Sequence, residues 1–404
     1  MKKLLGLTLL VMLLVYVAGI GLAQEVTEVT VWHYFADSEG MEWLEEEFND
    51  NHSDLEVDCR YIHFSELENQ ITKASMTGDV ADVVIIDGVN VAKWAENGAL
   101  APITAEAEAW GQEDNFFTGA WETGLYNGEL YALPQNINTL AIFYNKDLFK
   151  EADIDDTPAT WAELEETASK ISALGEKTYG FTFSAAKDES STFQFAPFIW
   201  QAGAEFDALD SEEANSALGL WQDMIENGYT PKSVLNTPQY ELAINFGAGN
   251  VGMMVNGPWA LSAFAEEAEF EYGVFTMPVR EDIDNPASVL GGESISIMSE
   301  SDNKEAAWEF IKFFQSPEVI GEWCELESRI PARSDVVSES ATWSEDRIMQ
   351  VFSEQLKYAL GRPKHPEYPK ISSEVQNAVQ KALTGDDVEE ALNKAAENID
   401  ELIQ

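Results

Sequence analysis

Two carboxylates, Asp87 and Glu293, stand where this sequence could do chemistry. Asp87 directly follows the apolar run "DVVII", and Glu293 follows a glycine pair in "VLGGES". Two carboxyl groups facing one cleft can hydrolyse a glycosidic bond, one acting as the acid and the other as base or nucleophile. Carboxylates at the rim of a binding cleft instead accept hydrogen bonds from ligand hydroxyl groups. A secreted glycosidase and a sugar binder are both open at this point.

Two histidines suggest a second kind of chemistry. His33 and His63 each follow a predicted strand, and together with Asp87 they would make a reasonable metal-ligand set. Histidines at strand ends more often hydrogen-bond to ligand or backbone oxygens. We therefore expect ligand contact rather than a metal site.

Arg329 and Arg333, in "SRIPARSD", could grip a phosphorylated or acidic solute through bidentate hydrogen bonds. The formal net charge of the chain is −50, and such a field repels anionic ligands. An acidic solute is therefore kept only as an alternative. The same charge makes nucleic acid and anionic membranes poor partners.

Trp259 is the aromatic residue whose place most favours ligand contact. The strand-like run "VGMMV" reaches Asn256, the pair Gly257-Pro258 ends it, and the tryptophan follows. A ring just past a strand-to-helix turn can lie on a cavity wall, where a flat indole suits the apolar face of a pyranose. The alternative is a core position, which we expect for the tryptophans inside amphipathic helices: Trp161, Trp221 and Trp308.

Alternating strands and helices predict an α/β sheet at the start of the chain. We expect strands over residues 26–32, 55–62 and 82–86, a helix over 40–49, and a second helix from a Ser65 cap to about Gly78. This order is typical of a parallel sheet, whose ligands gather beyond the carboxyl ends of the strands. Those ends carry Trp32-His33-Tyr34, Ile62-His63-Phe64 and Asp87-Gly88.

The rest of the chain shows no repeat and no long linker, so two lobes would have to touch or share crossing strands. Asn127-Gly128 predicts a two-residue hairpin turn, and Thr160 with Glu163 predicts a helix capping box. Further strands are expected over 140–145, 179–183, 251–255, 272–276 and 294–298, and helices from about Ser211, Pro238 and Asn303, with Gly385 between two C-terminal helices.

The N-terminal residues predict export from the cytoplasm, and the length and composition bound the number of domains. The 404 residues, 45% of them hydrophobic, suffice for two or three domains. Lys2-Lys3, the apolar run 4–17 and the small residues Gly21 and Ala23 predict a secretory signal cleaved after Ala23, with an uncut anchor as the alternative. Cys59 and Cys324 could form one disulfide in an oxidising compartment, and two free thiols fit equally well.

The order of motifs resembles the extracellular solute-binding proteins of ABC importers, in the carbohydrate-binding group similar to maltose-binding protein. The stretches that carry the resemblance cover nearly the whole mature chain in order. They are "VTVWHYF", "MTGDVADVVIIDG", "WAENGALAPIT", "YNGELYALPQNINTLAIFYNKDLF", "TPATWAELEETASKI", "FIWQAGAEF", "NFGAGNVGMMVNGPWAL", "VLGGESISIMSESDNKEAAWEFIKFFQSPE", "RIPARSD" and "ALTGDDVEEALNKAAENIDELI".

The resemblance implies an α/β, two-lobed periplasmic-binding-protein fold of type II. Each lobe would be a mostly parallel sheet flanked by helices, and crossing segments near residues 135–139, 291–295 and 330–336 would form the hinge. Lobe one would comprise residues 24–136 and 291–334, and lobe two residues 137–290 and 335–404.

The resemblance also implies the function. A mono- or oligosaccharide would stack on Trp259 between the lobes, and the closed monomer, periplasmic or secreted, would deliver it to membrane permease subunits of an ABC transporter. The placement of Asp87 and Glu293 at rim and hinge then favours hydrogen-bond acceptors over a catalytic pair, and no enzyme activity, metal or cofactor is expected. The expected ligand-binding residues are His33, Ser38, Phe64, Asp87, Gln135, Asn136, Trp200, Asn256, Trp259, Gly291, Gly292, Glu293, Arg329 and Tyr368.

Overall fold

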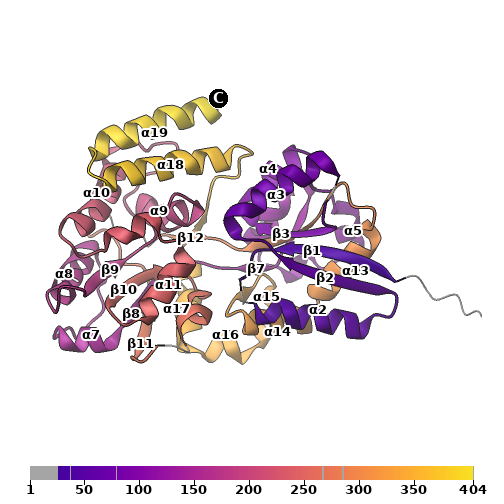
Figure 1. The fold of residues 1–404 in the computed structure, drawn as a ribbon, viewed down its shortest axis with the longest axis horizontal. Coiled ribbons are helices and arrows are strands. Elements are labelled where there is room, and N and C mark those ends of the chain that lie inside the picture. Colours follow the sequence, from indigo (N-terminus) through magenta and orange to yellow (C-terminus); the bar gives the residue numbers. More distant parts are fainter. Residues whose placement is uncertain (1–25, 37, 79, 266–267, 284–285, 404) are drawn as a thin grey trace, which may run out of the picture.

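The computed structural model describes residues 26–36, 38–78, 80–265, 268–283 and 286–403, so the predicted signal peptide lies outside the described residues. Two bodies lie side by side and are joined by a few extended segments (Figure 1). We call the body built on β1 to β3 lobe one and the body built on β8 to β11 lobe two. In the part of the chain that the structure describes, no helix has the length and apolar character needed to cross a membrane.

A five-stranded sheet in the order β2-β1-β3-β13-β6 forms the centre of lobe one. β1, β2 and β3 run parallel, as predicted. Residues 83–86 of β3 are all buried, as expected of a strand covered on both faces. The elements are β1 (Thr27–His33), α2 (Glu39–Asn51), β2 (Leu55–Tyr61), α3 (Phe64–Thr77), β3 (Val83–Asp87), α4 (Val91–Glu96), α5 (Thr104–Trp110), α6 (Thr118–Trp121), β4 (Leu125–Tyr126), β5 (Glu129–Leu130), β6 (Ala132–Pro134), β13 (Glu293–Ile297), α13 (Lys304–Phe314) and α14 (Pro317–Leu326).

Helix α3 starts one residue before Ser65, the residue that the sequence predicts as its cap. The backbone carbonyl of His63 already accepts hydrogen bonds from the amides of Glu66 and Leu67 at 2.8 and 3.1 Å, so α3 starts at Phe64 and the prediction of a Ser65 cap is wrong. The predicted capping box is confirmed, because Thr160 and Glu163 each accept from the other's backbone amide. The hairpin turn is confirmed as well, with Asn127 at φ 50° and Gly128 at φ 86°.

Lobe two contains a four-stranded sheet in the order β11-β8-β10-β9. Helices cover both of its faces, and α18 and α19 pack against α9 and α10 at the top of lobe two in Figure 1. The elements are β8 (Ala141–Asn145), α7 (Lys146–Glu151), α8 (Trp161–Ser172), β9 (Tyr179–Thr182), α9 (Glu189–Gln201), α10 (Glu212–Glu226), α11 (Gln239–Gly247), β10 (Val251–Asn256), α12 (Ala260–Phe264), β11 (Tyr272–Phe275), α17 (Arg347–Leu356), α18 (Tyr368–Leu383) and α19 (Val388–Ile403).

The expectation of a mostly parallel sheet in each lobe is confirmed, with one strand of each sheet running in the opposite direction. β13 pairs antiparallel with both β3 and β6, and β8 pairs antiparallel with β10 and β11. Both β13 and β8 follow directly on crossing segments, so they run away from the hinge beside strands that run toward it. A chain that enters a lobe at the hinge must adopt this direction, which the alternation of strands and helices does not reveal.

The crossing segments form short ladders of their own between the lobes. β7 (Asn136–Ile137) pairs with β14 (Ile330–Pro331), and β12 (Ser288–Leu290) pairs with β15 (Ala359–Gly361). Gly292 has φ +146°, and a Cβ there would lie 2.1 Å from the carbonyl oxygen of Asn136, so only glycine fits. The short helices α15 (Ser334–Glu339) and α16 (Ala341–Glu345) lie beneath these ladders in Figure 1.

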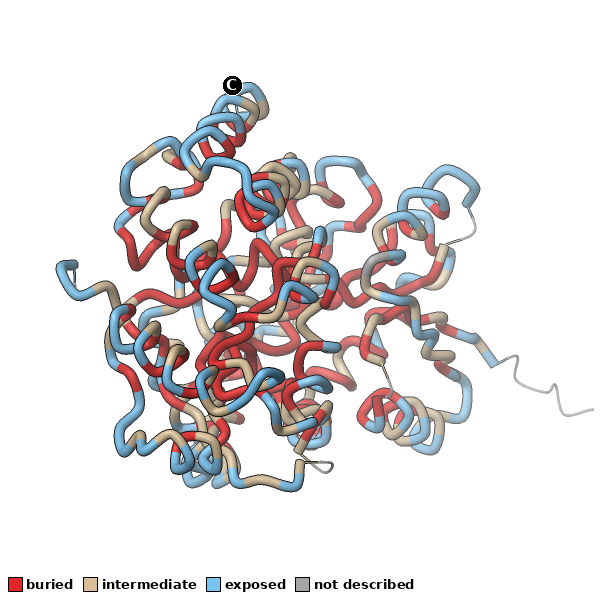
Figure 2. Tube along the Cα trace, turned by 60° about the vertical axis from the view of Figure 1, so that its left-hand side comes forward, coloured by how far each residue is buried: buried red, intermediate tan, exposed pale blue. Residues whose placement is uncertain are grey.

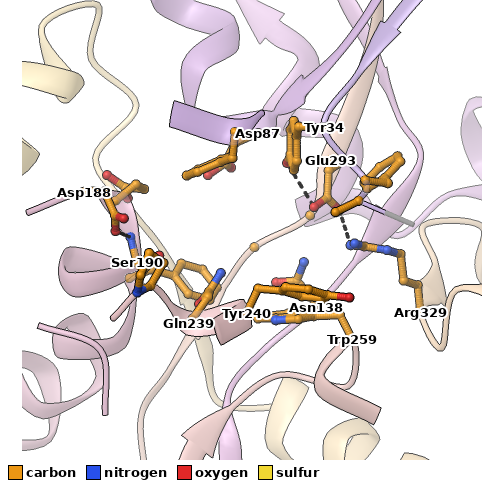
Figure 3. Close-up of a pocket in the computed structure, with 18 of the residues that line it drawn as sticks. Tyr34, Asp87, Asn138, Asp188, Ser190, Gln239, Tyr240, Trp259, Glu293 and Arg329 are labelled. Atoms are coloured by element: carbon orange, nitrogen blue, oxygen red, sulfur yellow. Dashed lines mark hydrogen bonds and ion pairs between the residues drawn. The ribbon is translucent and has the colours of Figure 1, made fainter. Parts of the chain in front are cut away.

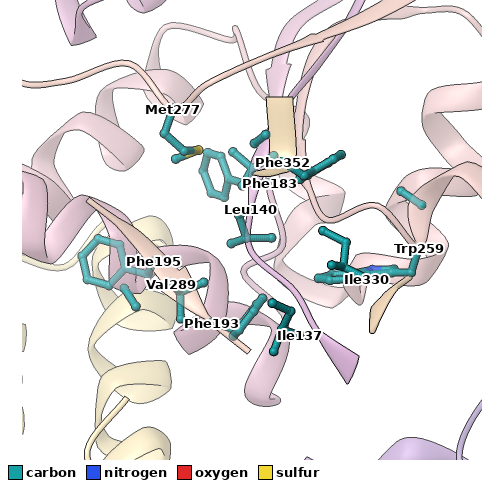
Figure 4. Close-up of a cluster of buried hydrophobic side chains, with 14 of the residues drawn as sticks. Ile137, Leu140, Phe183, Phe193, Phe195, Trp259, Met277, Val289, Ile330 and Phe352 are labelled. Carbon is teal, nitrogen blue, oxygen red and sulfur yellow. The ribbon is translucent and has the colours of Figure 1, made fainter. Parts of the chain in front are cut away.

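Buried side chains fill both lobes and continue under the hinge. Figure 2 shows buried segments at the centre of each body and exposed segments on the outer helices. Figure 4 draws the part of this core near the crossing strands, where Ile137 and Ile330 belong to one cluster with Phe193 and Trp259. Cys59 and Cys324 are both free thiols, which settles the alternative that the sequence left open.

Candidate functional site

A cavity of about 260 Å³ lies between the two lobes. The carboxyl end of β3 and the segments after β1 and β2 supply its lobe-one wall, and the starts of α9, α11 and α12 supply its lobe-two wall. Figure 3 shows Asp87, Tyr34 and Glu293 on one side and Gln239, Tyr240 and Trp259 on the other. The site therefore forms where the sequence places it, beyond the carboxyl ends of parallel strands.

Trp259 lies on the cavity wall because the preceding turn brings its ring back over Gly257. A Cβ at Gly257 would lie 2.0–2.5 Å from atoms of the indole, so the six-membered ring rests on the glycine backbone. Asn256 fixes the turn, since its Oδ1 accepts from the Gly257 amide at 3.0 Å and its Nδ2 donates to the Gln239 carbonyl at 2.9 Å. Trp259 is 8% exposed and lines the cavity.

Arg362 links the two walls. Its guanidinium donates to both oxygens of Asp87 in lobe one, at 2.7 and 2.9 Å, and to Oε1 of Glu189 in lobe two, at 2.6 Å. Glu189 also accepts from the hydroxyls of Tyr368, at 2.6 Å, and Ser372, at 2.5 Å. The side chain of Arg362 is only 3% exposed and packs 4.7 Å from the ring centroid of Phe193, so this ionic group is buried.

Burial and neighbouring charges shift the pKa values of this group. Burial raises the pKa of Glu189, and the nearby Asp87 raises it further, whereas Arg362 lowers it. Burial lowers the pKa of Arg362, but Asp87 and the other acidic partners outweigh burial, and its pKa lies well above the ordinary value. The arginine therefore stays charged while it bridges the lobes.

Arg329 forms a second ionic group at the hinge. It donates to Oε2 of Glu293 at 2.9 Å, and Tyr34 donates to Oε1 of the same carboxylate at 3.0 Å. Burial lowers the pKa of Arg329, but Glu293 and Glu327 more than compensate, so its pKa is raised. Glu327 in turn accepts from the Ser38 hydroxyl at 2.6 Å. Glu293 therefore holds the guanidinium directly, while Tyr34 and Ser38 hold the carboxylates of Glu293 and Glu327.

The structure brings half of the predicted site residues to the cavity. Those that line it are Phe64, Asp87, Trp259, Gly291, Gly292, Glu293 and Arg329. Asn136 instead lines an adjoining cavity of about 210 Å³, which shares Gly291 and Gly292 with the first.

The remaining predicted residues act on the cavity indirectly or not at all. Trp200 points into the lobe-two core, where its indole N–H donates to Glu205 at 3.1 Å. Ser38 caps α2, Asn256 fixes the turn before Trp259, and Tyr368 is buried behind Glu189 rather than forming a platform. Gln135 and His33 are buried beside the cavity lining without forming part of it.

Several lining residues were missed by sequence reasoning. Asn138 comes from the first crossing, Asp188 and Ser190 from the start of α9, and Gln239 and Tyr240 from the start of α11. The signal that could have found the α9 residues is the cap motif "DESST" after a predicted strand. Arg362 lies in "GRPKHPEYP", a segment that has no periodic pattern, so only the fold places it.

The structure does not bring together the residues of the alternative metal site, His33, His63 and Asp87, or the two arginines of the alternative anion site. His63 and Asp87 line the cavity but His33 does not, and among the described residues no group of three or more potential metal ligands occurs. Arg333 is turned away from the cavity, since it forms an ion pair with Asp335 at 2.6 Å and donates to the Gln315 carbonyl at 3.1 Å. Arg329 and Arg333 therefore do not converge on one ligand.

We expect His33→Phe to reduce the loss of stability in acid. Burial lowers the pKa of His33 to about 4, so the folded protein keeps the ring neutral while the unfolded chain binds a proton below about pH 6.5. The stability that this difference contributes is present above pH 6.5 and is lost toward pH 4, by roughly 3 kcal/mol in full. Urea unfolding at pH 7 and pH 4 should show that the free energy of unfolding falls more between these pH values in the parent than in the variant. Equal losses would contradict this assignment.

The comparisons with known proteins agree with this geometry. A family model described as bacterial extracellular solute-binding protein matches residues 43–351. The maltotriose-binding protein of Pyrococcus abyssi is 27% identical over 386 residues, covering 92% of this chain and 82% of that protein. The sn-glycerol-3-phosphate-binding periplasmic protein of Shigella dysenteriae is 25% identical over 425 residues, covering 96% and 95%. The solved structure of an ABC transporter solute-binding protein from Thermotoga lettingae, bound with α-D-tagatose, is similar with a TM-score of 0.87 at 28% identity, covering 94% and 100%.

Proposed function

The chain belongs to the bacterial extracellular solute-binding proteins, and from this membership we propose that it captures a carbohydrate between its lobes and delivers it to the permease of an ABC transporter. Its fold is that of the type II periplasmic binding proteins, and the family implies a periplasmic or secreted location. In this proposal the protein acts as a monomer, with lobe one comprising residues 24–136 and 291–334 and lobe two residues 137–290 and 335–404.

The observation that carries the carbohydrate proposal is the contrast between the two cavity walls. Trp259 and Tyr240 offer aromatic surface from lobe two, while Asp87 and Glu293 offer carboxylates from lobe one and the hinge (Figure 3). A pyranose has an apolar face and a rim of hydroxyl groups, so it can use both walls at once. Only the closed arrangement brings both walls to one ligand, so ligand binding would favour closure.

A phosphorylated solute, such as the Shigella relative binds, suits this cavity less well. A phosphate needs guanidinium N–H groups that are free to donate. Arg362 is already occupied by Asp87 and Glu189, and Arg329 by Glu293. The Nε–H of each arginine has no hydrogen-bond partner among the described residues, but a phosphate bound there would lie beside the carboxylates that already pair with the same guanidinium, so we retain the acidic solute only as an outcome of the binding test.

We also propose that the protein is not a glycosidase. Asp87 and Glu293 are register partners on adjacent antiparallel strands, and each is paired with a different arginine. A carboxylate held by a guanidinium is poorly suited to donate a proton to a leaving group. Incubation with oligosaccharides should give no hydrolysis products, and turnover would overturn this part of the proposal.

The test of the proposed function is intrinsic tryptophan fluorescence during titration with mono- and oligosaccharides. We expect a saturable change with at least one sugar, because ligand contact alters the surroundings of Trp259. Glycerol 3-phosphate and a sugar 6-phosphate serve as matched anionic ligands. Saturation by these anions with no response to any sugar would replace the carbohydrate proposal by the acidic one.

A further inference from the structure

The cavity lining carries more carboxylates than its arginines neutralise. Arg362 is shared between Asp87 and Glu189, and Arg329 faces both Glu293 and Glu327. Each guanidinium group is therefore already opposed by two acids. The lining contains six carboxylates, Asp87, Asp188, Glu189, Glu241, Glu293 and Glu327, against two guanidinium groups.

Asp188 and Glu241 are the two lining carboxylates that lie outside both ionic groups. Asp188 is half-buried at the start of α9 and accepts one hydrogen bond, from the Ser190 amide at 2.9 Å. Glu241 is exposed in α11, where its carboxylate has no hydrogen bond or ion pair within the described ranges. Lys187 precedes Asp188, and both line a neighbouring cavity of about 250 Å³, but no ion pair joins the two side chains among the described residues. In the part of the chain that the structure describes, neither of these two carboxylates on the lobe-two wall forms an ion pair.

An independent feature of the same cavity points to a bound polar ligand. Asn138 is only 4% exposed and lines the cavity, and its Oδ1 has no hydrogen-bond partner among the residues that the structure describes. Figure 3 shows its amide directed toward the space between the walls. A buried amide without a partner is unfavourable, and an amide can both donate to and accept from a ligand hydroxyl group.

We propose that the preferred ligand is an aminated carbohydrate, with its protonated primary amine bound by Asp188 and Glu241 and a hydroxyl group bound by Asn138. The proposal rests on the proposed function, because it specifies which carbohydrate the cavity takes. The aromatic faces of Tyr240 and Trp259 also attract a cation and not an anion. The chain's net charge of −50 favours the approach of cationic ligands in the same way.

The experiment compares matched sugars that differ only at one substituent. Glucose, galactose and mannose, and the disaccharide cellobiose, are titrated beside their 2-amino-2-deoxy, N-acetylated and 6-phosphorylated counterparts, at about pH 6.5, where a primary amine is protonated. We expect the amino form of the accepted sugar to bind about tenfold more tightly than the neutral form. The preference should shrink as salt rises from about 0.05 to 0.5 M, because screening weakens charge pairing.

Two variants assign the preference to the named carboxylates. Asp188→Asn keeps an N-cap residue on α9 while removing the charge, and Glu241→Gln keeps the shape of its side chain. In each, the ratio of the amino-sugar to the neutral-sugar affinity should fall several-fold. Glu389→Gln, in the exposed first turn of α19, removes the same charge far from the cavity and should leave the ratio unchanged.

The possible results distinguish the aminated ligand from the more general proposal of carbohydrate binding. Tighter binding of the neutral or N-acetylated sugar, or a ratio that neither variant changes, overturns the aminated ligand and leaves carbohydrate binding intact. Spermidine is the control for a cation without a sugar ring. Binding of spermidine in the absence of binding to every sugar would overturn both proposals.

Discussion

Replacing Trp259 by alanine should weaken carbohydrate binding by about 1–3 kcal/mol, which is roughly a tenfold to hundredfold rise in Kd. The reason is the loss of a flat apolar surface that the protein holds rigid, since Gly257 supports one face of the indole and Phe193 lies 6.2 Å away by ring centroids. The measurement is isothermal titration with the sugar that gives the strongest fluorescence response. Trp259→Phe should lose less binding free energy than Trp259→Ala, because a smaller ring remains in place.

A matched control separates stacking from general damage to lobe two. Trp200→Phe alters another tryptophan of the same lobe, which packs against Phe206 and does not line the cavity, so its Kd should match that of the parent. Gly257→Ala tests the position of the ring without removing it. The new Cβ would lie 2.0–2.5 Å from atoms of the indole and force the ring to move. Parent-like affinity in Trp259→Ala, with circular dichroism unchanged, would make this tryptophan a core residue only.

The turn at Gly257 explains why Trp259 could be predicted from the sequence and Trp200 could not. Strand, glycine, proline and tryptophan follow one another in the chain, so local chemistry alone directs the ring to the end of the sheet. Trp200 lies inside a helix that is buried on nearly every side. Which side of such a helix meets a cavity depends on its neighbours in space, and one sequence does not contain that information.

The same distinction applies to the fold and to the charged groups. The parallel strands β1 to β3 follow from local alternation, whereas the antiparallel entry of β8 and β13 depends on where the chain crosses between lobes. Asp87 directly follows a predicted strand, so the sequence predicts its place at the cavity, but its partner Arg362 is 275 residues away in the chain. Ionic groups between the lobes join residues that meet only in the folded protein, so no periodic pattern in the sequence predicts them.

Removing Arg362, the partner of Asp87 and Glu189, should have a large effect on the free energy of unfolding. Arg362→Ala should lower the free energy of unfolding by about 3–5 kcal/mol, because it leaves Asp87 and Glu189 buried together without a counterion. Arg60→Ala is the matched control, since Arg60 pairs with Asp58 at the surface, where the two side chains are 56% and 39% exposed. An exposed pair contributes about 1 kcal/mol or less. Urea unfolding of both variants at pH 7.5 supplies the comparison.

The difference in free energy of unfolding between the parent and Arg362→Ala should also depend on pH. Its direction follows from the surroundings of Glu189. Burial raises the pKa of Glu189 and Arg362 opposes that rise, so the variant's folded-state pKa lies higher still. A carboxyl whose folded pKa exceeds its unfolded value destabilises the protein as pH rises from the unfolded value, about 4.3, through the folded one. The gap between parent and variant should therefore be wider at pH 8 than at pH 5, and Glu189→Gln in the Arg362→Ala background should recover part of it. A gap that is equal at both pH values, or a loss no larger than that of Arg60→Ala, would mean that the buried bridge between the lobes does not hold in solution.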